Sequence, residues 1–233
     1  KNIINTIVLD AGHGGKDPGA CVKKCKIKEK DITLSITKKV GQILKQKYNM
    51  NVIYTREDDR FVKLHNRTKI ANDNNAKIFI SIHANSIEGS PSTKGFETYL
   101  LKIDKSSAAV NEVEKRENQV IQLETKTDNP NMISRHLAMK IQKANLKESK
   151  ELAQLIQQEI SKTTNSVNRG VKQAGFQVLW GATMPNVLIE VGFITNNNEA
   201  KNLMSSKYQD KIANGIANAV MLYKKKNDKY ILQ

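Results

Sequence analysis

Two histidines each follow a short apolar run that is typical of a buried strand. His13 comes after Ile3–Leu9, separated from it by a glycine-containing turn, and His83 directly follows Ile78–Ile82. Ligand sites of open α/β sheets lie outside the carboxyl ends of the strands, so parallel neighbouring strands would bring the two imidazoles together. Imidazole is the commonest protein ligand for metals. A lone histidine is more often an ordinary loop residue, but two at equivalent strand ends favour a metal site.

A carboxylate is available to complete such a site. Glu29 stands at the start of a predicted helix, after the lysine-rich loop that follows the first strand. The helix dipole favours a carboxylate at this position, so the position alone does not require a ligand role. Two histidines and one carboxylate are nevertheless the ligand set of a catalytic zinc centre, which leaves its fourth position to water.

Glu190 is the most unusual charge in the sequence, because it lies inside the apolar run 186–193. Burying a carboxylate is unfavourable unless another group pairs with it or uses it. An outward-pointing residue of an edge strand would be the plainer explanation. Near a bound metal, Glu190 would suit the role of a general base that activates water.

Strand and helix patterns alternate along most of the chain. Apolar residues at helical spacing predict helices over 29–48, 64–74, about 148–160 and 206–223. Short β-branched runs predict strands over 3–9, 51–55, 78–82, 96–101, about 175–179 and 186–191. The lysine-rich tail 224–226 is expected to fray. The pattern predicts an α/β fold, a single domain with a central, mostly parallel (mixed) twisted sheet of about six strands flanked by helices.

Residues 104–147 differ from the rest of the chain, since they contain no strand pattern and many charges of both signs. Helices are predicted over 110–123 and 133–141, with a break at the proline between them. We expect a helical insertion carried by the α/β domain, so that the whole chain 1–233 forms one domain.

Composition limits the function classes. The 233 residues have 39% hydrophobic content, which suffices for a core and is too high for a disordered chain. No stretch approaches the roughly 20 consecutive apolar residues of a membrane helix. The net charge of +15, from 38 Lys+Arg against 23 Asp+Glu, suggests nucleic acid, an anionic surface or an acidic polymer as partner.

The cysteines and the first residue bear on the compartment. Cys21 and Cys25 are the two cysteines of the sequence, and their spacing is compatible with a local disulfide or with two free thiols. The sequence begins with lysine instead of methionine. We expect a signal peptide upstream of it and a periplasmic or secreted location.

Four motifs, in order along essentially the whole chain, resemble those of the zinc-dependent N-acetylmuramoyl-L-alanine amidases of the amidase type 3 family. They lie at 7–20, around His13, at Glu29-Lys30-Asp31, at Ser81-Ile82-His83-Ala84-Asn85, and at 187–196, around Glu190. The resemblance implies one zinc ion per chain, with His13, Glu29 and His83 as ligands and Glu190 as the catalytic carboxylate. It also implies cleavage of the amide between N-acetylmuramic acid and the L-alanine of the peptidoglycan stem peptide. Arg56 and Gly95-Phe96-Glu97 match further family positions, and we expect structural roles for them.

The resemblance extends to periplasmic cell-division amidases, in which an inserted helix covers the zinc site and a glutamate from it occupies the metal. The corresponding segment here offers Glu112, Glu114, Glu117 and Glu124. We expect Glu114 or Glu117 to take this regulatory part, although a solvated helix with balanced charges would show the same pattern. The resemblance also implies peptidoglycan as a partner, an activator protein that acts on the insertion, and a role in daughter-cell separation. We expect a monomer.

Two other function classes stay open. A non-catalytic peptidoglycan-binding relative would keep the fold, but it would have no need of the complete set of two histidines and two glutamates. A nucleic-acid-binding protein is suggested by charge alone. The lysines are dispersed along the chain, and the sequence has neither an RNA-binding aromatic motif nor a cysteine–histidine finger, so no nucleic-acid partner is expected.

Overall fold

The computed structural model describes residues 3–22, 24–103, 112–124 and 132–229. The strands are β1 (Thr6–Ala11), β2 (Cys21–Val22), β3 (Ile27–Lys28), β4 (Asn51–Tyr54), β5 (Ile78–Asn85), β6 (Phe96–Leu101), β7 (Asn168–Ala174) and β8 (Asn186–Phe193). The α-helices are α1 (Glu29–Tyr48), α2 (Leu64–Asp73), α3 (Glu112–Asn118), α4 (Met132–Ala144), α5 (Leu146–Thr163), α6 (Asn197–Met204) and α7 (Ser206–Lys229). Two short 3₁₀ helices are η1 (Gln119–Leu123) and η2 (Gln177–Leu179).

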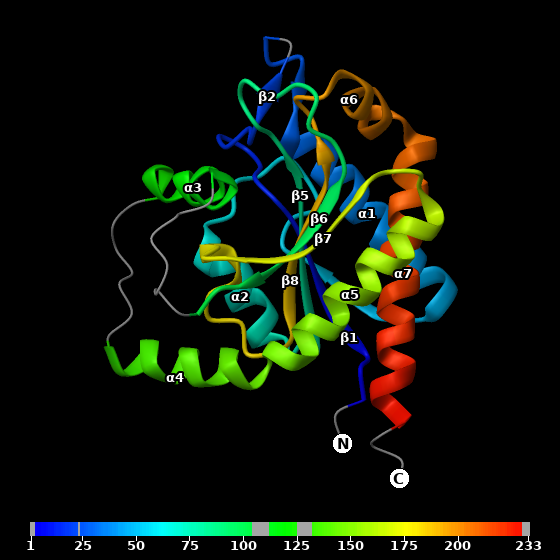
Figure 1. The fold of residues 1–233 in the computed structure, drawn as a ribbon. Coiled ribbons are helices and arrows are strands. Elements are labelled where there is room, and N and C mark those ends of the chain that lie inside the picture. The colour runs from blue at the N-terminus through cyan, green and yellow to red at the C-terminus, as the bar shows by residue number, and fades with distance from the viewer. Residues whose placement is uncertain (1–2, 23, 104–111, 125–131, 230–233) are drawn as a thin grey trace.

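A six-stranded mixed sheet forms the centre of the molecule, with the strand order β4-β1-β5-β8-β6-β7 (Figure 1). The neighbours β4, β1, β5 and β8 run parallel, while β6 is antiparallel to β8 and parallel to β7. The predicted fold class is therefore confirmed. The carboxyl ends of β1, β5 and β8 meet at one edge of the sheet, together with the first residues of β6 and β7.

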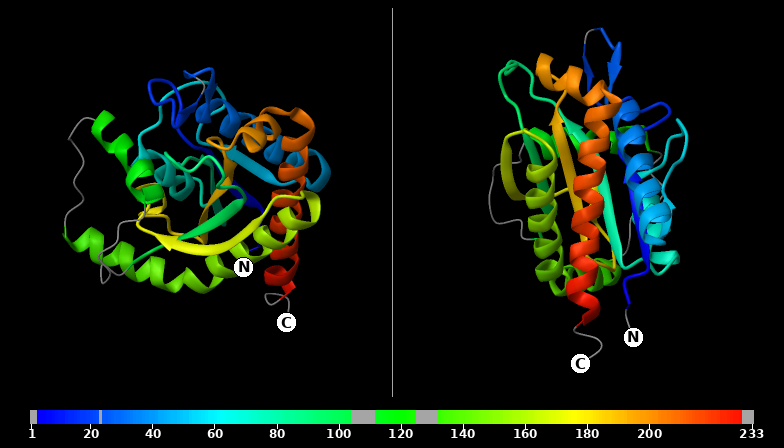
Figure 2. Two further views of the ribbon diagram at one scale, coloured as in Figure 1. Left: turned by 45° about the horizontal axis from the view of Figure 1, so that its top comes forward. Right: turned by 90° about the vertical axis from the view of Figure 1, so that its right-hand side faces the viewer.

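Helices cover both faces of the sheet, and the sheet separates two hydrophobic cores. One core packs β-strand side chains such as Ile80 and Ile189 against α1, α5, α6 and α7. Figure 2 shows α1, α5 and α7 side by side over this face. The second core packs Phe79, Tyr99 and Leu188 against α2, α3, η1 and η2. Among the described residues, no helix is both long and apolar enough to cross a membrane.

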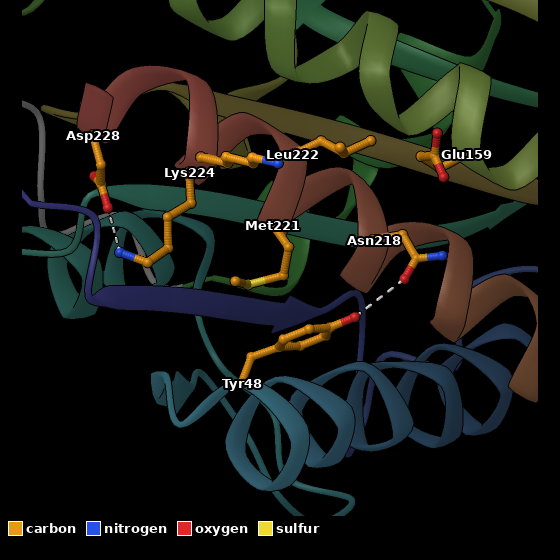
Figure 3. Close-up of a pocket in the computed structure, with 8 residues that line it drawn as sticks. Tyr48, Glu159, Asn218, Met221, Leu222, Lys224 and Asp228 are labelled. Carbon is orange, nitrogen blue, oxygen red and sulfur yellow. Dashed lines mark hydrogen bonds and ion pairs between the residues drawn. The ribbon is translucent and has the colours of Figure 1, made fainter. Parts of the chain in front are cut away.

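A pocket of about 490 Å³ lies between α1, α5 and α7 (Figure 3). Tyr48 and Met221 line it, and Lys224 and Asp228 form an ion pair at one end. These helices cover the face of the sheet opposite to Tyr99 and Leu188, so the pocket is separated from that face by the sheet.

Two sequence-based predictions of secondary structure were wrong. A strand was expected at 175–179. The strand in this region is β7, which ends at Ala174, and residues 177–179 form the 3₁₀ helix η2. β7 is an edge strand whose polar residues are exposed or half-buried, so it has no apolar run in the sequence. The apolar residues Phe176 and Leu179 pack into the second core without forming a strand. The tail 224–226 is helical, because α7 continues to Lys229 and Asp228 accepts a hydrogen bond from the Ile4 amide.

Some elements of the structure were not predicted from the sequence, and one prediction, the regulatory insertion, is not tested by the structure. The β2–β3 hairpin and α6 were not predicted. The helical segments expected at 110–123 and 133–141 correspond to α3 with η1 and to α4, which lie between β6 and α5. Parts of 104–147 fall outside the described residues, so the assignment of this segment as a regulatory insertion stays a prediction.

A buried polar network holds the carboxyl end of β1. Asp10 is fully buried, and its Oδ1 accepts hydrogen bonds from Arg67 at 2.8 Å and from Thr55 at 2.5 Å. Its Oδ2 accepts from Ser81 at 2.6 Å, which joins β1 to β5. Burial raises the pKa of Asp10, but Arg67 and the two hydroxyls outweigh that effect and lower it. The carboxylate therefore contributes stability in its charged form.

We expect Asp10→Asn to lower the free energy of unfolding by about 3–5 kcal/mol at pH 7, because it leaves Arg67 as a buried charge without its partner. The folded pKa of Asp10 lies below its ordinary value of 3.8, so its contribution is present above that pH and is lost as pH falls through the folded pKa. Urea denaturation at pH 7 and pH 3 measures both effects. Asp73→Asn, which removes an exposed ion pair with Lys69, is the matched control and is expected to cost less than about 1 kcal/mol. An Asp10→Asn effect no larger than the control would contradict the prediction.

Candidate metal centre

His13 stands in a strained loop that follows β1. Its backbone has φ 62°, a left-handed conformation that is uncommon outside glycine. Arg67 donates to the carbonyl oxygens of Ala11 and His13 at 2.7 and 2.9 Å, and Arg56 donates to Gly12 O at 2.8 Å. The two buried guanidinium groups thus hold consecutive carbonyls of the loop, and the expected structural role of Arg56 agrees with its contacts.

The glycine before His13 allows the two histidines to meet. A Cβ atom on Gly12 would lie only 2.4–2.7 Å from three ring atoms of His83. With glycine in this position, the rings of His13 and His83 pack edge to face, with centroids 4.9 Å apart. The predicted convergence of the two strand ends is therefore present.

Glu29 reaches the same point from the first residue of α1. Its carboxylate is fully buried and accepts backbone hydrogen bonds from Ala20 and Ala84, both at 2.9 Å. These two bonds fix the carboxylate between the β2 side of the site and the end of β5. Its Oε1 lies 3.1 Å from His13 Nε2 and 3.3 Å from His83 Nδ1.

Glu190 lies on β8 directly beside His83, its register partner on β5. The side chain is fully buried, so it is not the outward-pointing edge residue that the plainer explanation required. Residues paired in this way project from the same face of a sheet. The structure thus places Glu190 next to the cluster formed by His13, Glu29 and His83.

A third carboxylate enters the cluster from α3. Glu117 Oε2 lies 2.8 Å from His83 Nδ1 and 3.2 Å from His13 Nε2. Its neighbour Arg116 donates to Glu117 Oε1, to Asn85 Oδ1 at 3.1 Å and to Glu190 Oε1 at 3.5 Å. Two consecutive residues of α3 therefore contact the histidine cluster and Glu190 at the same time.

The other three glutamates of this segment lie away from the cluster. Glu114 accepts a hydrogen bond from the Gly175 amide at 2.7 Å, and Glu124 accepts one from the Leu64 amide at 2.6 Å. Glu112 is exposed at the start of α3. Of the two candidates named from the sequence, Glu117 faces the histidines and Glu114 binds a loop.

The donor atoms fit a metal ion. One ligand atom from each of His13, Glu29, His83 and Glu117 lies within 4.8 Å of all the others, and all four residues are buried. His13 Nε2, His83 Nε2, Glu117 Oε2 and Glu190 Oε2 are buried without a hydrogen-bond partner within the described part of the chain. The separations of His13 Nε2 from Glu29 and of both histidines from Glu117 thus lack hydrogen-bond geometry, whereas His83 Nδ1 and Glu29 Oε1 share a hydrogen bond of 3.3 Å. Nitrogen and carboxylate oxygen atoms converging in this way are the donor set that zinc prefers.

Comparison with known proteins agrees with this geometry. The family profile described as N-acetylmuramoyl-L-alanine amidase, Amidase_3, matches residues 7–221. The chain belongs to the Amidase_3 family of N-acetylmuramoyl-L-alanine amidases. The amidase is accordingly a hydrolase that acts on peptidoglycan.

Individual relatives resemble the amidase over nearly its whole length. It is 34% identical over 220 residues to the N-acetylmuramoyl-L-alanine amidase AmiA of Escherichia coli, covering 93% of this chain and 75% of AmiA. A crystal structure of an N-acetylmuramoyl-L-alanine amidase from Clostridium difficile superposes with a TM-score of 0.73 at 29% identity, covering 95% and 97% of the two chains. The CwlD amidase from Clostridioides difficile, solved in complex with the GerS lipoprotein, gives a TM-score of 0.70 at 32% identity and coverage of 94% and 98%.

Charges in the metal-free cluster are strongly coupled. Burial lowers the pKa of both histidines, but the effect of the facing carboxylates is larger. The pKa of His13 therefore lies well above its ordinary value, and the pKa of His83 rises to about 9. Burial raises the pKa of Glu29, yet His13 outweighs it and lowers the value to about 2. Burial and the nearby Glu117 carboxylate raise the pKa of Glu190. The cluster therefore stabilises positive charge at its centre.

Sequence reasoning missed two residues that orient the site. Asp17 Oδ2 lies 2.8 Å from His13 Nδ1, an arrangement that sets the orientation of a ligand histidine and leaves Nε2 directed at the cluster. Its position four residues after His13 was the available signal. Arg116 was not named from the sequence, because it lies among many charges of one helix. Cys21 and Cys25 are both free thiols in the structure, which favours that alternative over a disulfide.

We expect the amidase to bind about one zinc ion per chain, and His83→Ala to remove most of that binding because it deletes a central donor. Metal analysis after dialysis against zinc, together with the zinc-dependent rise in melting temperature, measures the effect. His65→Ala is the control, since His65 is exposed on α2, and it is expected to keep the metal. Equal metal content in both variants would contradict the assignment.

Proposed function

We propose that this chain is a zinc-dependent amidase that cleaves the bond between N-acetylmuramic acid and L-alanine. His13, Glu29 and His83 would hold the metal, and Glu190 would be the catalytic carboxylate. One observation carries the proposal: the buried Nε2 atoms of His13 and His83 have no hydrogen-bond partner among the described residues, and the two rings converge with the Glu29 carboxylate beside a buried carboxylate on the next strand. A non-catalytic wall-binding relative would gain nothing from such a costly buried arrangement.

Each residue has a separate task in this reaction. Zinc held by His13, Glu29 and His83 would supply a Lewis acid and would lower the pKa of a coordinated water. Asp17 holds the orientation of His13, while the backbone amides of Ala20 and Ala84 hold that of Glu29. Their fixed positions keep the ligand set preorganised, so that little reorganisation is needed during turnover.

Glu190 carries out the proton transfers. It accepts a proton from the attacking water, whose oxygen forms a bond to the lactyl carbonyl carbon. It then donates that proton to the alanine nitrogen as the carbon–nitrogen bond breaks, which leaves a carboxyl group and a free stem peptide.

The contacts of α3 support autoinhibition. Glu117 lies next to both histidines, where it would serve as a further donor to a metal held by His13, Glu29 and His83, and Arg116 lies against Glu190. With α3 in place, substrate could reach neither the metal position nor the catalytic carboxylate. The regulatory residue that we propose is Glu117, and Glu114 would only fasten α3 to Gly175.

Movement of α3 would require an external trigger. The contacts of Arg116 with Asn85 and Ser86 and that of Glu114 with Gly175 tie the helix to the domain. We therefore propose that an activator protein displaces the segment carrying α3. CwlD, a structural relative, was solved bound to the lipoprotein GerS. By the same proposal the protein acts outside the cytoplasm, in the periplasm or after secretion, during wall remodelling and daughter-cell separation.

We expect Glu117→Ala to raise the hydrolysis of purified sacculi about tenfold or more, because it removes the carboxylate from the metal position and weakens the hold of α3. Release of stem peptides, followed by chromatography, measures the rate. Glu114→Ala is the matched control on the same helix and is expected to give a smaller rise. Deletion of residues 106–145 should raise activity as well. No gain over the intact chain in either Glu117→Ala or the deletion would count against autoinhibition.

We expect Glu190→Gln, introduced into the Glu117→Ala protein, to lower kcat about 10²–10⁴-fold while zinc content stays unchanged, because the amide cannot transfer the proton. Steady-state kinetics on a muramyl peptide and metal analysis give the two readouts. Retained turnover, or loss of zinc along with activity, would show that Glu190 does not play this role.

A further inference from the structure

A second buried glutamate lies beside Glu190 and has no part in the chemistry described above. Glu97 is the second residue of β6, and its register partner on the antiparallel strand β8 is Glu190. Directly opposite residues project from the same face of a sheet, with Cβ atoms about 4.5–5.5 Å apart. Only 2% of Glu97 is exposed. Its carboxylate therefore lies under the same surface as the catalytic centre, one strand further from the metal cluster.

Two cations from the edge strand β7 hold this carboxylate. Arg169 Nε donates to Glu97 Oε1 at 2.5 Å, and Lys172 Nζ donates to Oε2 at 2.7 Å. The Tyr99 hydroxyl donates to Oε2 as well, at 2.5 Å. Burial raises the pKa of Glu97, but the effect of these three partners is larger and lowers the pKa, so the carboxylate is charged. Two positive charges face one negative charge, and one positive charge remains in excess.

The excess charge is presented to solvent, while the anchor beneath it is not. The side chains of Arg169 and Lys172 are 33% and 37% exposed, against 2% for Glu97. The Arg169 guanidinium lies over the Phe193 ring at 5.2 Å, and Lys172 Nζ lies 5.9 Å from the Tyr99 ring centroid. Aromatic rings and a buried carboxylate thus fix two cations that would otherwise be flexible.

Arg169 still has a donor to offer. Its Nε binds Glu97 and its Nη1 lies 3.5 Å from Lys94 O, whereas Nη2 makes no hydrogen bond to any other described residue. Guanidinium groups bind carboxylates with planar, charge-assisted hydrogen bonds. A second carboxylate could therefore bind at Nη2 and at Lys172 without displacing Glu97.

We infer that Arg169 and Lys172, positioned by Glu97, form a subsite for a carboxylate of the stem peptide. The subsite lies on the β7 side of the catalytic centre, away from β5 and β1, so the inference requires the departing peptide to extend across β6 toward β7. β7 is two strand spacings, about 9.6 Å, from β8. An extended peptide advances about 3.3–3.6 Å per residue, so the subsite would meet the second or third residue after the scissile amide. This inference rests on the proposed amidase function and specifies the acidic peptide that it would prefer.

Two synthetic N-acetylmuramoyl tripeptides test the subsite, differing only by a free carboxylate or a carboxamide on the second residue. Hydrolysis by the Glu117→Ala protein gives KM and kcat, and calorimetry gives binding in the Glu117→Ala, Glu190→Gln protein. We expect KM and Kd to favour the carboxylate about tenfold, with kcat nearly equal, because a charge-assisted hydrogen bond forms in both ground and transition states. A parallel pair altered at the third residue determines which position binds.

Lys172→Gln should reduce this preference, because only Arg169 then remains to bind the carboxylate, and Lys172→Arg should retain it. Lys201→Gln, which removes an exposed charge on α6, is the control and should leave the preference unchanged. Melting temperatures separate a structural effect from a loss of recognition.

If neither position shows a carboxylate preference, or if Lys172→Gln keeps it while only stability falls, the two cations merely neutralise Glu97 and the inference is wrong. If the peptides bind with the expected preference but are not cleaved, the subsite stands and the proposed catalytic function fails.

Discussion

The site depends on two buried arginines that hold the chain where β1 ends. Arg56 and Arg67 donate to the carbonyl oxygens of Ala11, Gly12 and His13, which the turn leaves without strand partners. Unpaired buried carbonyls would otherwise destabilise the loop. Because the carbonyls are held in sequence, the backbone of His13 can stay in its left-handed conformation and direct its ring at His83. Asp10 compensates part of the buried charge through Arg67.

A second constraint is the concentration of negative charge around the histidines. Glu29, Glu117 and Glu190 are all buried at the same edge of the sheet. Such an arrangement is unfavourable unless cations balance it. Arg116 neutralises part of it, and the raised pKa values of His13 and His83 show the remaining demand for positive charge. A divalent metal would meet the same demand.

The α/β fold could be predicted because its central strands are buried on both faces and therefore read as continuous apolar runs. The edge strand β7 was not predicted for the opposite reason, because it has no continuous apolar run. Its Arg169 and Lys172 pair with Glu97 and are partly exposed to solvent. The helical end of α7 was mistaken for a frayed tail because Asp228 is held by the Ile4 amide, from the other end of the chain. Contacts between residues so distant in sequence leave no local pattern.

The sequence alone was enough to name four candidate residues of the site. His13 and His83 follow apolar strands, Glu29 opens a helix and Glu190 interrupts an apolar strand, and each of these signals is local. Only the tertiary structure decided which charged side chains meet them. Glu114 and Glu117 are indistinguishable as members of one charged helix, yet only Glu117 faces the histidines, because the docking of α3 turns that side inward. Arg67 and Arg116 gain their roles in the same way, since hydrogen bonds between residues distant in sequence depend on packing that periodicity does not encode.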